Sequence, residues 1–234
     1  MLEKIDDDFI QSESGTILTI SKLNHVWGDD DYSDLQEELS RIINPFGKNE
    51  RFNITFKYNG EDNPIDIQVP EFVNHPKYLF NASVDSDGNV EWTYSFSPLK
   101  KGLDFSNNVA GILTWNEILE DLQSELNKTA QKNYRILSSK IPSCGAFKME
   151  IRVWDRDAES IQDITELYSM KRSAYKSALR AYKGLSVYRD GVLVLPKSEA
   201  SRDWIGLDLR RVGRVGDRIS TNQIIGIIEI SISI

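Results

Sequence analysis

Apolar and polar residues alternate along several short segments of the chain, which is the pattern of half-buried β-strands. Near the carboxyl end, residues 185–188 and 192–195 are two β-rich runs joined by an Arg-Asp-Gly turn at 189–191. Asp-Gly between two such runs is a strong indication of a β-hairpin. We expect its second strand to stop at Pro196, because proline has no amide proton to give to a ladder. Residues 228–234 alternate strictly and predict a further strand with one buried and one solvent-exposed face.

The rest of the chain combines strand patterns with amphipathic helices. The other predicted strands are residues 17–20, 51–58, 65–69, 78–84, 90–96 and 145–154. Apolar residues at helical spacing predict helices over residues 32–43, 115–128, 155–167 and 173–182. Residues 98–115 show no clear pattern, and residues 129–142 are expected to form a loop or a mobile insertion. Hairpins interleaved with separate helices favour an α+β fold.

Composition places the chain among ordinary globular proteins. Its 234 residues are 40% hydrophobic and 27% charged, which is enough for a sizeable core. The net charge of −8 gives no general attraction to nucleic acid or to an anionic membrane. No segment approaches the roughly 20 apolar residues that span a bilayer, and the first residues lack the apolar core of a signal peptide. Cys144 is the only cysteine, which excludes an intrachain disulfide and favours a cytoplasmic location.

Motifs for catalysis and metal binding are scarce. His25 and His75 are the only histidines and neither has a supporting motif, so a nucleophilic triad and a zinc site are not expected. The three aspartates at 29–31 lack the spacing of a calcium loop and fit an acidic turn that caps a helix. Neither common glycine-rich phosphate loop occurs in the chain. The residues alone therefore predict no catalytic residue and no metal site.

A resemblance to a known family begins near the amino end. Residues 14–23 read Ser-Gly-Thr-Ile-Leu-Thr-Ile-Ser-Lys-Leu, and a helical pattern at 27–46 and a strand with an Asn-Gly turn at 51–60 follow. This order resembles the way out of the ATP-binding domain in the GHKL superfamily, which includes gyrase B, the large heat-shock chaperones, histidine kinases, MutL and the microrchidia proteins. In that family a Gly-Thr pair follows the ATP lid, and its threonine joins the polar network around the adenine. Gly15 and Thr16 match that pair.

The carboxyl-terminal part carries a second resemblance. The matching pieces are residues 145–147, 153–157, 187–191, 203–211 and 223–226. Together they look like the second domain of bacterial ATP-binding GHKL proteins of the microrchidia and MutL type. In the superfamily this transducer domain has the fold of the second domain of ribosomal protein S-five, a mixed sheet backed by helices. The resemblance covers most of the chain except residues 98–142.

The catalytic motifs of that family have no counterpart in the chain. GHKL ATPases carry a Glu…Asn helix, an Asp-x-Gly-x-Gly loop and a glycine-rich lid, all upstream of the Gly-Thr strand. None of these is present. The resemblance therefore implies the downstream part of a larger ATPase, in which ATP and Mg²⁺ bind to an upstream ATP-binding domain. This chain alone is not expected to hydrolyse ATP.

The resemblance also implies a division of the chain into regions. Residues 1–23 are expected to be the end of the ATP-binding domain or a linker, and residues 24–142 a connecting α+β region. Within that region, residues 98–142 are expected to include a mobile insertion. Residues 143–234 are expected to be a transducer-like α+β region that pairs with residues 48–97.

A basic residue of the transducer loop reaches the γ-phosphate in relatives of this kind. The candidates are Lys197, Arg202, Arg210 and Arg211, in or beside the loop after the carboxyl-terminal hairpin. A cation is effective there only where phosphate charge accumulates. The alternative is that Arg210 and Arg211 pair with Asp203 and Asp208, or lie in solvent.

Two other functions stay open on the sequence. The arginines at 210, 211, 214 and 218 form a basic cluster that is typical of nucleic-acid-binding modules, although the net charge of −8 argues against it. A protein-interaction domain without a nucleotide role is the other alternative. A homodimer is expected by analogy with the family only, and the process that the protein serves is not indicated.

Overall fold

The computed structural model describes residues 16–40, 42–46, 54–58, 65–67, 69–98, 107–129, 142, 144–198, 202–211 and 219–230. The chain divides into two compact units, Met1–Leu35 and Gln36–Ile234. Helix α1 (Asp29–Ser40) begins with three acidic residues in its first turn, which suits the positive end of the helix dipole.

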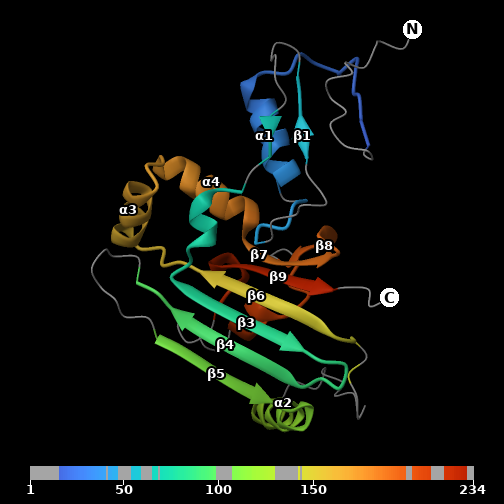
Figure 1. Ribbon diagram of the computed structural model, residues 1–234, viewed down its shortest axis with the longest axis vertical. Coiled ribbons are helices and arrows are strands. Elements are labelled where there is room, and N and C mark those ends of the chain that lie inside the picture. The colour runs from blue at the N-terminus through green and yellow to red at the C-terminus, as the bar shows by residue number, and fades with distance from the viewer. Residues whose placement is uncertain are drawn as a thin grey trace. The chain divides into compact units, whose positions relative to one another are not determined.

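A seven-stranded mixed sheet forms the centre of the second unit (Figure 1). Its strands are β3 (Tyr78–Val84), β4 (Val90–Phe96), β5 (Asn107–Leu113), β6 (Phe147–Val153), β7 (Gly184–Arg189), β8 (Val192–Ser198) and β9 (Ile224–Ile230). Their order is β5-β4-β3-β6-β9-β7-β8, and every neighbouring pair is antiparallel except β7 and β9. A separate two-stranded sheet pairs β1 (Thr55–Phe56) with β2 (Ile65–Asp66).

Helices complete the second unit and confirm the α+β prediction. The α-helices are α2 (Trp115–Thr129), α3 (Ala158–Leu167), α4 (Arg172–Tyr182) and α5 (Leu207–Arg211), and the short 3-10 helices are η2 (Glu71–Asn74) and η3 (Thr221–Gln223). Asp157 caps α3 by accepting a hydrogen bond of 2.9 Å from the amide of Ser160. The helix patterns of the sequence are confirmed within a few residues at each end.

The β3–β4 hairpin forms where the alternation predicts it. In its turn, the Asp85 carboxylate accepts hydrogen bonds of 2.9 Å from the backbone amides of Asp87 and Asn89. Gly88 occupies the left-handed region with φ of 85°, which favours glycine. The predicted common face of the second strand is confirmed, because the register sets Trp92, Tyr94 and Phe96 opposite Ala82, Phe80 and Tyr78.

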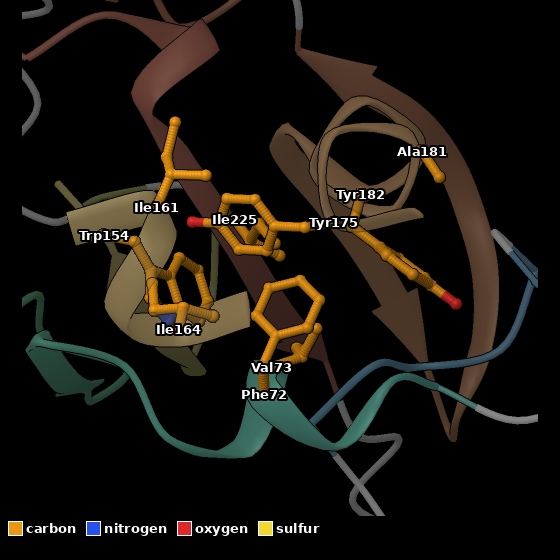
Figure 2. Close-up of a cluster of buried hydrophobic side chains, with 9 residues drawn as sticks. All are labelled: Phe72, Val73, Trp154, Ile161, Ile164, Tyr175, Ala181, Tyr182 and Ile225. Carbon is orange, nitrogen blue, oxygen red and sulfur yellow. The ribbon is translucent and has the colours of Figure 1, made fainter. Parts of the chain in front are cut away.

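The hydrophobic core forms where η2, α3 and α4 pack against the sheet. Figure 2 shows its members, which are Phe72, Val73, Trp154, Ile161, Ile164, Tyr175, Ala181, Tyr182 and Ile225. The Phe72 ring is central to this core, with its centroid 4.9 Å from that of Tyr175 and 5.8 Å from that of Trp154. Tyr182 points away from these three rings (Figure 2). The buried aromatic rings provide a large part of the area removed from water.

The predicted strand at residues 17–20 is wrong. Residues 16–20 form no strand, and the side chain of Leu18 is 82% exposed. The β-branched composition is favourable for a strand, but a strand is stable only when another strand completes its hydrogen bonds. No strand among the described residues pairs with this segment.

The predicted end of the hairpin at Pro196 is also wrong, because β8 continues to Ser198. β8 is the last strand in the sheet order, so a missing amide proton on its outer side breaks no ladder there. The pairing between β7 and β8 also shifts register between Leu185 and Val187, and a bulge of this kind accommodates proline.

β5 lies within the stretch for which the sequence shows no clear pattern. It pairs along its whole length with β4, from Asn107 opposite Phe96 to Leu113 opposite Val90. The predicted strand at 51–58 is shorter in the structure, where β1 covers only Thr55–Phe56, and residues 51–53 lie outside the described residues. Residues 231–234 of the last predicted strand also lie outside them.

Candidate functional site

Three of the four candidate phosphate-sensing residues lie around α5, between β8 and β9, and the fourth lies in β8. Lys197 belongs to β8, Arg202 is exposed just before α5, and Arg210 and Arg211 are the last residues of α5. The side chains of Lys197, Arg210 and Arg211 lie outside the described part of the structure. Arg202, Arg210 and Arg211 share one segment of the chain, residues 202–211, which we call the α5 segment.

Asp203 fixes the start of α5. Its carboxylate accepts hydrogen bonds of 2.9 Å from the amide of Leu207 and 3.0 Å from the amide of Leu209. The chain turns between them at Gly206, whose φ of 70° is easily adopted only by glycine. The amide of Gly206 donates to the Asp203 carbonyl at 3.1 Å. Asp203 thus supplies acceptors to helix amides that have no partner inside the helix.

Asp208 ties the α5 segment to η3. Its carboxylate accepts a hydrogen bond of 3.2 Å from the amide of Thr221 and a second one from the Thr221 hydroxyl. Thr221 and its neighbour Ser220 are fully buried. Ser220 and Gln223 form a capping box around η3, in which Gln223 Oε1 accepts from the Ser220 amide at 2.9 Å. η3 leads directly into β9, so the α5 segment is anchored at the base of an interior strand of the sheet.

These contacts bear on the predicted pairing of the arginines with Asp203 and Asp208. Both carboxylates already accept hydrogen bonds from backbone amides or from Thr221. The two carboxylates therefore stabilise the backbone of the α5 segment and its contact with η3, independently of any pairing with an arginine. Arg214 and Arg218 of the predicted basic cluster lie outside the described residues, so the cluster stays a prediction.

The predicted adenine-side residues belong to the first unit. Gly15 lies outside the described residues, and Thr16 is exposed and not part of a strand. The segment that follows is lined with exposed apolar side chains, which are Ile17, Leu18, Ile20, Leu23 and Val26. We call residues 16–26 the amino-terminal segment. Its apolar side chains are available to a binding partner.

An open groove of about 630 Å³ crosses the strands from β5 to β9. The register sets Lys148 of β6 opposite Ser83 of β3 on one side and opposite Glu229 of β9 on the other. Glu91 and Glu150 also line the groove. Glu150 is paired with Arg152, but Glu91 and Glu229 still outnumber Lys148. An excess of carboxylates repels phosphate, and this groove is therefore a poor site for a nucleotide.

The two histidines each contact a neighbouring side chain, and the cysteine is exposed. His25 Nε2 lies 3.4 Å from Asp31, whose pKa is lowered mainly by the Gly28 amide and then by His25. The His75 ring stacks on Tyr168 with centroids 5.9 Å apart, and Cys144 is exposed. In the part of the chain that the structure describes, no group of three or more His, Cys, Asp or Glu residues is placed to hold a metal ion.

The sequence pattern gives no sign that Arg152 is buried. Its guanidinium donates from Nε to Glu150 Oε1 at 2.6 Å and from Nη1 to the carbonyl of Val73. It also lies 3.8 Å from the centroid of the Phe46 ring. Strand alternation correctly places Arg152 on the polar face, but only the position of η2 shows that this end of the face is covered.

Lys77 and Asp155 form a second ion pair close by. The hydrogen bond to Asp155 is the main reason that the pKa of Lys77 is raised above its usual range. The Lys77 ammonium also lies 5.7 Å from the ring centroid of Tyr78 and 5.9 Å from that of Phe96. Because both charges already have partners at the edge of the core, this pair is structural.

No helix within the described ranges combines the length and the apolar character needed to cross a bilayer. Comparisons with protein families, with curated proteins and with solved structures found no match to this chain.

Proposed function

We propose that this chain is the transducer part of a GHKL-type ATPase, which couples ATP binding in a separate domain to movement of domains or subunits. The observation that carries this proposal is the amino-terminal segment, a β-rich apolar run that is exposed and unpaired among the described residues. In the GHKL proteins that this chain resembles, the matching segment is the last strand of the ATP-binding domain. Such a strand needs the rest of that domain's sheet to be stable.

Exposure of the segment has a measurable cost. Ile17 is 45% exposed, Leu18 82% and Ile20 64%. Fully burying one such side chain contributes about 1.5–3 kcal/mol. Docking the segment as an added strand would gain this burial together with a ladder of backbone hydrogen bonds. A role as the joint to another domain accounts for both features.

The α5 segment is the proposed reporter of the nucleotide. A γ-phosphate that attracts Arg210 or Arg211 pulls on a short helix whose Asp208 is bonded to the buried Thr221. Thr221 lies in η3, directly before β9, which sits between β6 and β7 in the sheet. Movement at the phosphate is thereby passed to the interior of the sheet, which is how a local charge can bias a larger element.

The separate domain supplies the chemistry. The chain has none of the three upstream family motifs, which are the Glu…Asn helix, the Asp-x-Gly-x-Gly loop and the glycine-rich lid. ATP and Mg²⁺ are bound by an ATP-binding domain of the Bergerat type, encoded upstream in the same reading frame. The seven-stranded sheet and its helices are the part that this domain moves. They agree with the S-five-like transducer in being an α+β arrangement with a mixed sheet, and the agreement goes no further.

Amide hydrogen exchange of residues 16–20 tests the joint. In this chain alone we expect these amides to exchange without protection, because they form no ladder. When the ATP-binding domain is attached, we expect them to become protected as a strand of its sheet. Strong protection in the isolated chain, or no gain of protection with the domain attached, rejects the proposed joint. Deuterium uptake in β3 serves as the internal control, because both of its edges are already paired.

A further inference from the structure

β5 is an outer edge of the seven-stranded sheet (Figure 1). One side of it is paired with β4, and no strand among the described residues pairs with the other side. Its residues Asn107–Ala110 are exposed, and Ile112 is 69% exposed. An edge of this kind presents a row of backbone amides and carbonyls to any strand that approaches.

The two edges of the sheet differ in how they are protected. β8, at the opposite edge, carries Pro196 and Lys197, has a shifted register with β7, and forms a bridge from Val192 to Ile43. These are the usual devices that prevent strands from joining at an edge. β5 reads Asn-Asn-Val-Ala-Gly-Ile-Leu, with no charge and no proline, and it pairs with β4 without a bulge. β5 is therefore open to an added strand.

We propose that β5 pairs antiparallel with β5 of a second copy of this chain, which joins the two sheets into one. Pairing of a strand with itself satisfies two-fold symmetry when it is antiparallel and centred on one residue. With Ala110 at the centre, Val109 lies opposite Gly111 of the partner subunit and Asn108 lies opposite Ile112 of the partner subunit. Each large side chain then meets a smaller or absent one.

Trp92 explains why the shapes fit. A Cβ atom at Gly111 would lie 2.7 Å from Cζ2 and 2.8 Å from Cε2 of the Trp92 ring, so the ring covers this glycine. The ring thereby extends over β5 toward the free edge. Val109 of the partner subunit would lie on the same face, directly beyond Gly111. Pairing would place a half-exposed valine against an indole ring, a favourable aromatic contact between strands.

The sequence of β5 removes one obstacle to pairing between two acidic copies. With a net charge of −8, two copies repel each other over most of their surfaces. β5 itself has no charged residue, so no like charges lie opposite each other within the paired strands. This proposal does not depend on the ATP-linked function, because it rests on β5 and its neighbours alone.

Sedimentation equilibrium at micromolar concentrations tests the dimer with charge variants. Ala110→Lys places two like charges opposite each other at the symmetry axis, and we expect it to weaken the dimer at least about tenfold. Asn108→Glu combined with Ile112→Lys places opposite charges across the interface and should keep the dimer. Val194→Lys, at an exposed position on the other edge, is the matched control and should leave the dimer unchanged.

Far-ultraviolet circular dichroism checks that each variant is folded, which is expected because the altered side chains are exposed. A monomeric native chain overturns the proposal. A dimer that Ala110→Lys leaves intact, or that Val194→Lys disrupts instead, also overturns it.

Discussion

The hydroxyl of Tyr188 donates a hydrogen bond of 3.1 Å to the carbonyl of Ile43, 145 residues earlier in the chain. Tyr188 is buried in β7, and Ile43 forms a bridge with Val192 of β8. These contacts hold the residues that follow α1 against the β7–β8 edge. They also cover part of an edge that would otherwise be open to other strands.

Replacing Tyr188 by Phe keeps the buried ring and removes the hydroxyl. We expect the free energy of unfolding to fall by about 1 kcal/mol, because the Ile43 carbonyl loses a donor in a buried place. Urea unfolding at neutral pH measures the change. An unchanged unfolding midpoint would show that this hydrogen bond contributes nothing to stability.

Tyr175→Phe should behave differently, because the Tyr175 hydroxyl is buried and has no hydrogen-bond partner among the described residues. We expect this variant to be at least as stable as the native chain at neutral pH. Urea midpoints of the two proteins, measured side by side, provide the comparison. A clear loss of stability on removing this hydroxyl would mean that it has a partner.

Tyr175 also predicts a pH dependence. Burial raises its pKa from 10.0 to about 12. Because the folded-state pKa is the higher one, the stability linked to the neutral phenol is fully present below pH 10.0 and is lost as the pH rises toward about 12. Native chain and Tyr175→Phe should therefore diverge in urea midpoint over this range, with the native chain losing more. Parallel losses in both proteins would contradict the prediction.

Arg152→Ala should destabilise the second unit by about 3 kcal/mol, because it leaves buried acceptors unpaired and removes the contact with Phe46. Arg156→Ala is the matched control. Arg156 is exposed and donates one hydrogen bond of 2.8 Å to the Asn222 carbonyl, so we expect less than about 1 kcal/mol. Equal losses in the two variants would show that burial of Arg152 is not what matters.

Thr221→Val tests the anchor of the α5 segment while it keeps the side-chain volume. Loss of the hydroxyl removes one of the hydrogen bonds to Asp208, and we expect amides of α5 to exchange faster than in the native chain. Thr93→Val, at an exposed position on β4, is the control and should leave this exchange unchanged. Unaltered exchange in α5 after Thr221→Val would contradict a role for this anchor.

Local sequence patterns predict a strand correctly where the fold also provides a partner strand for it. The β3–β4 hairpin follows from alternation and from a turn that Asp85 closes. β5 shows little alternation because most of its residues are exposed on both faces, and it is a strand because β4 offers it an edge. Residues 17–20 show the opposite case. Their composition favours a strand, but no described strand pairs with them, and they form none.

For the candidate site, the sequence predicts where the residues lie along the chain but not the contacts that they make. The sequence locates Arg202, Arg210 and Arg211 beside the carboxyl-terminal hairpin, and the structure places them in one segment around α5. The hydrogen bond between Asp208 and Thr221 could not be predicted, because it joins residues 13 positions apart and no sequence motif marks the pair. Burial of Arg152 likewise depends on where η2 packs.

We propose that this chain responds to ATP bound by another domain. Amide hydrogen exchange of α5 tests this response when the ATP-binding domain is attached and a nonhydrolysable ATP analogue is compared with ADP. We expect exchange in α5 to slow with the ATP analogue, because the γ-phosphate draws the segment into a fixed position. Identical exchange with both nucleotides, or ATP hydrolysis by this chain alone, would contradict the claim.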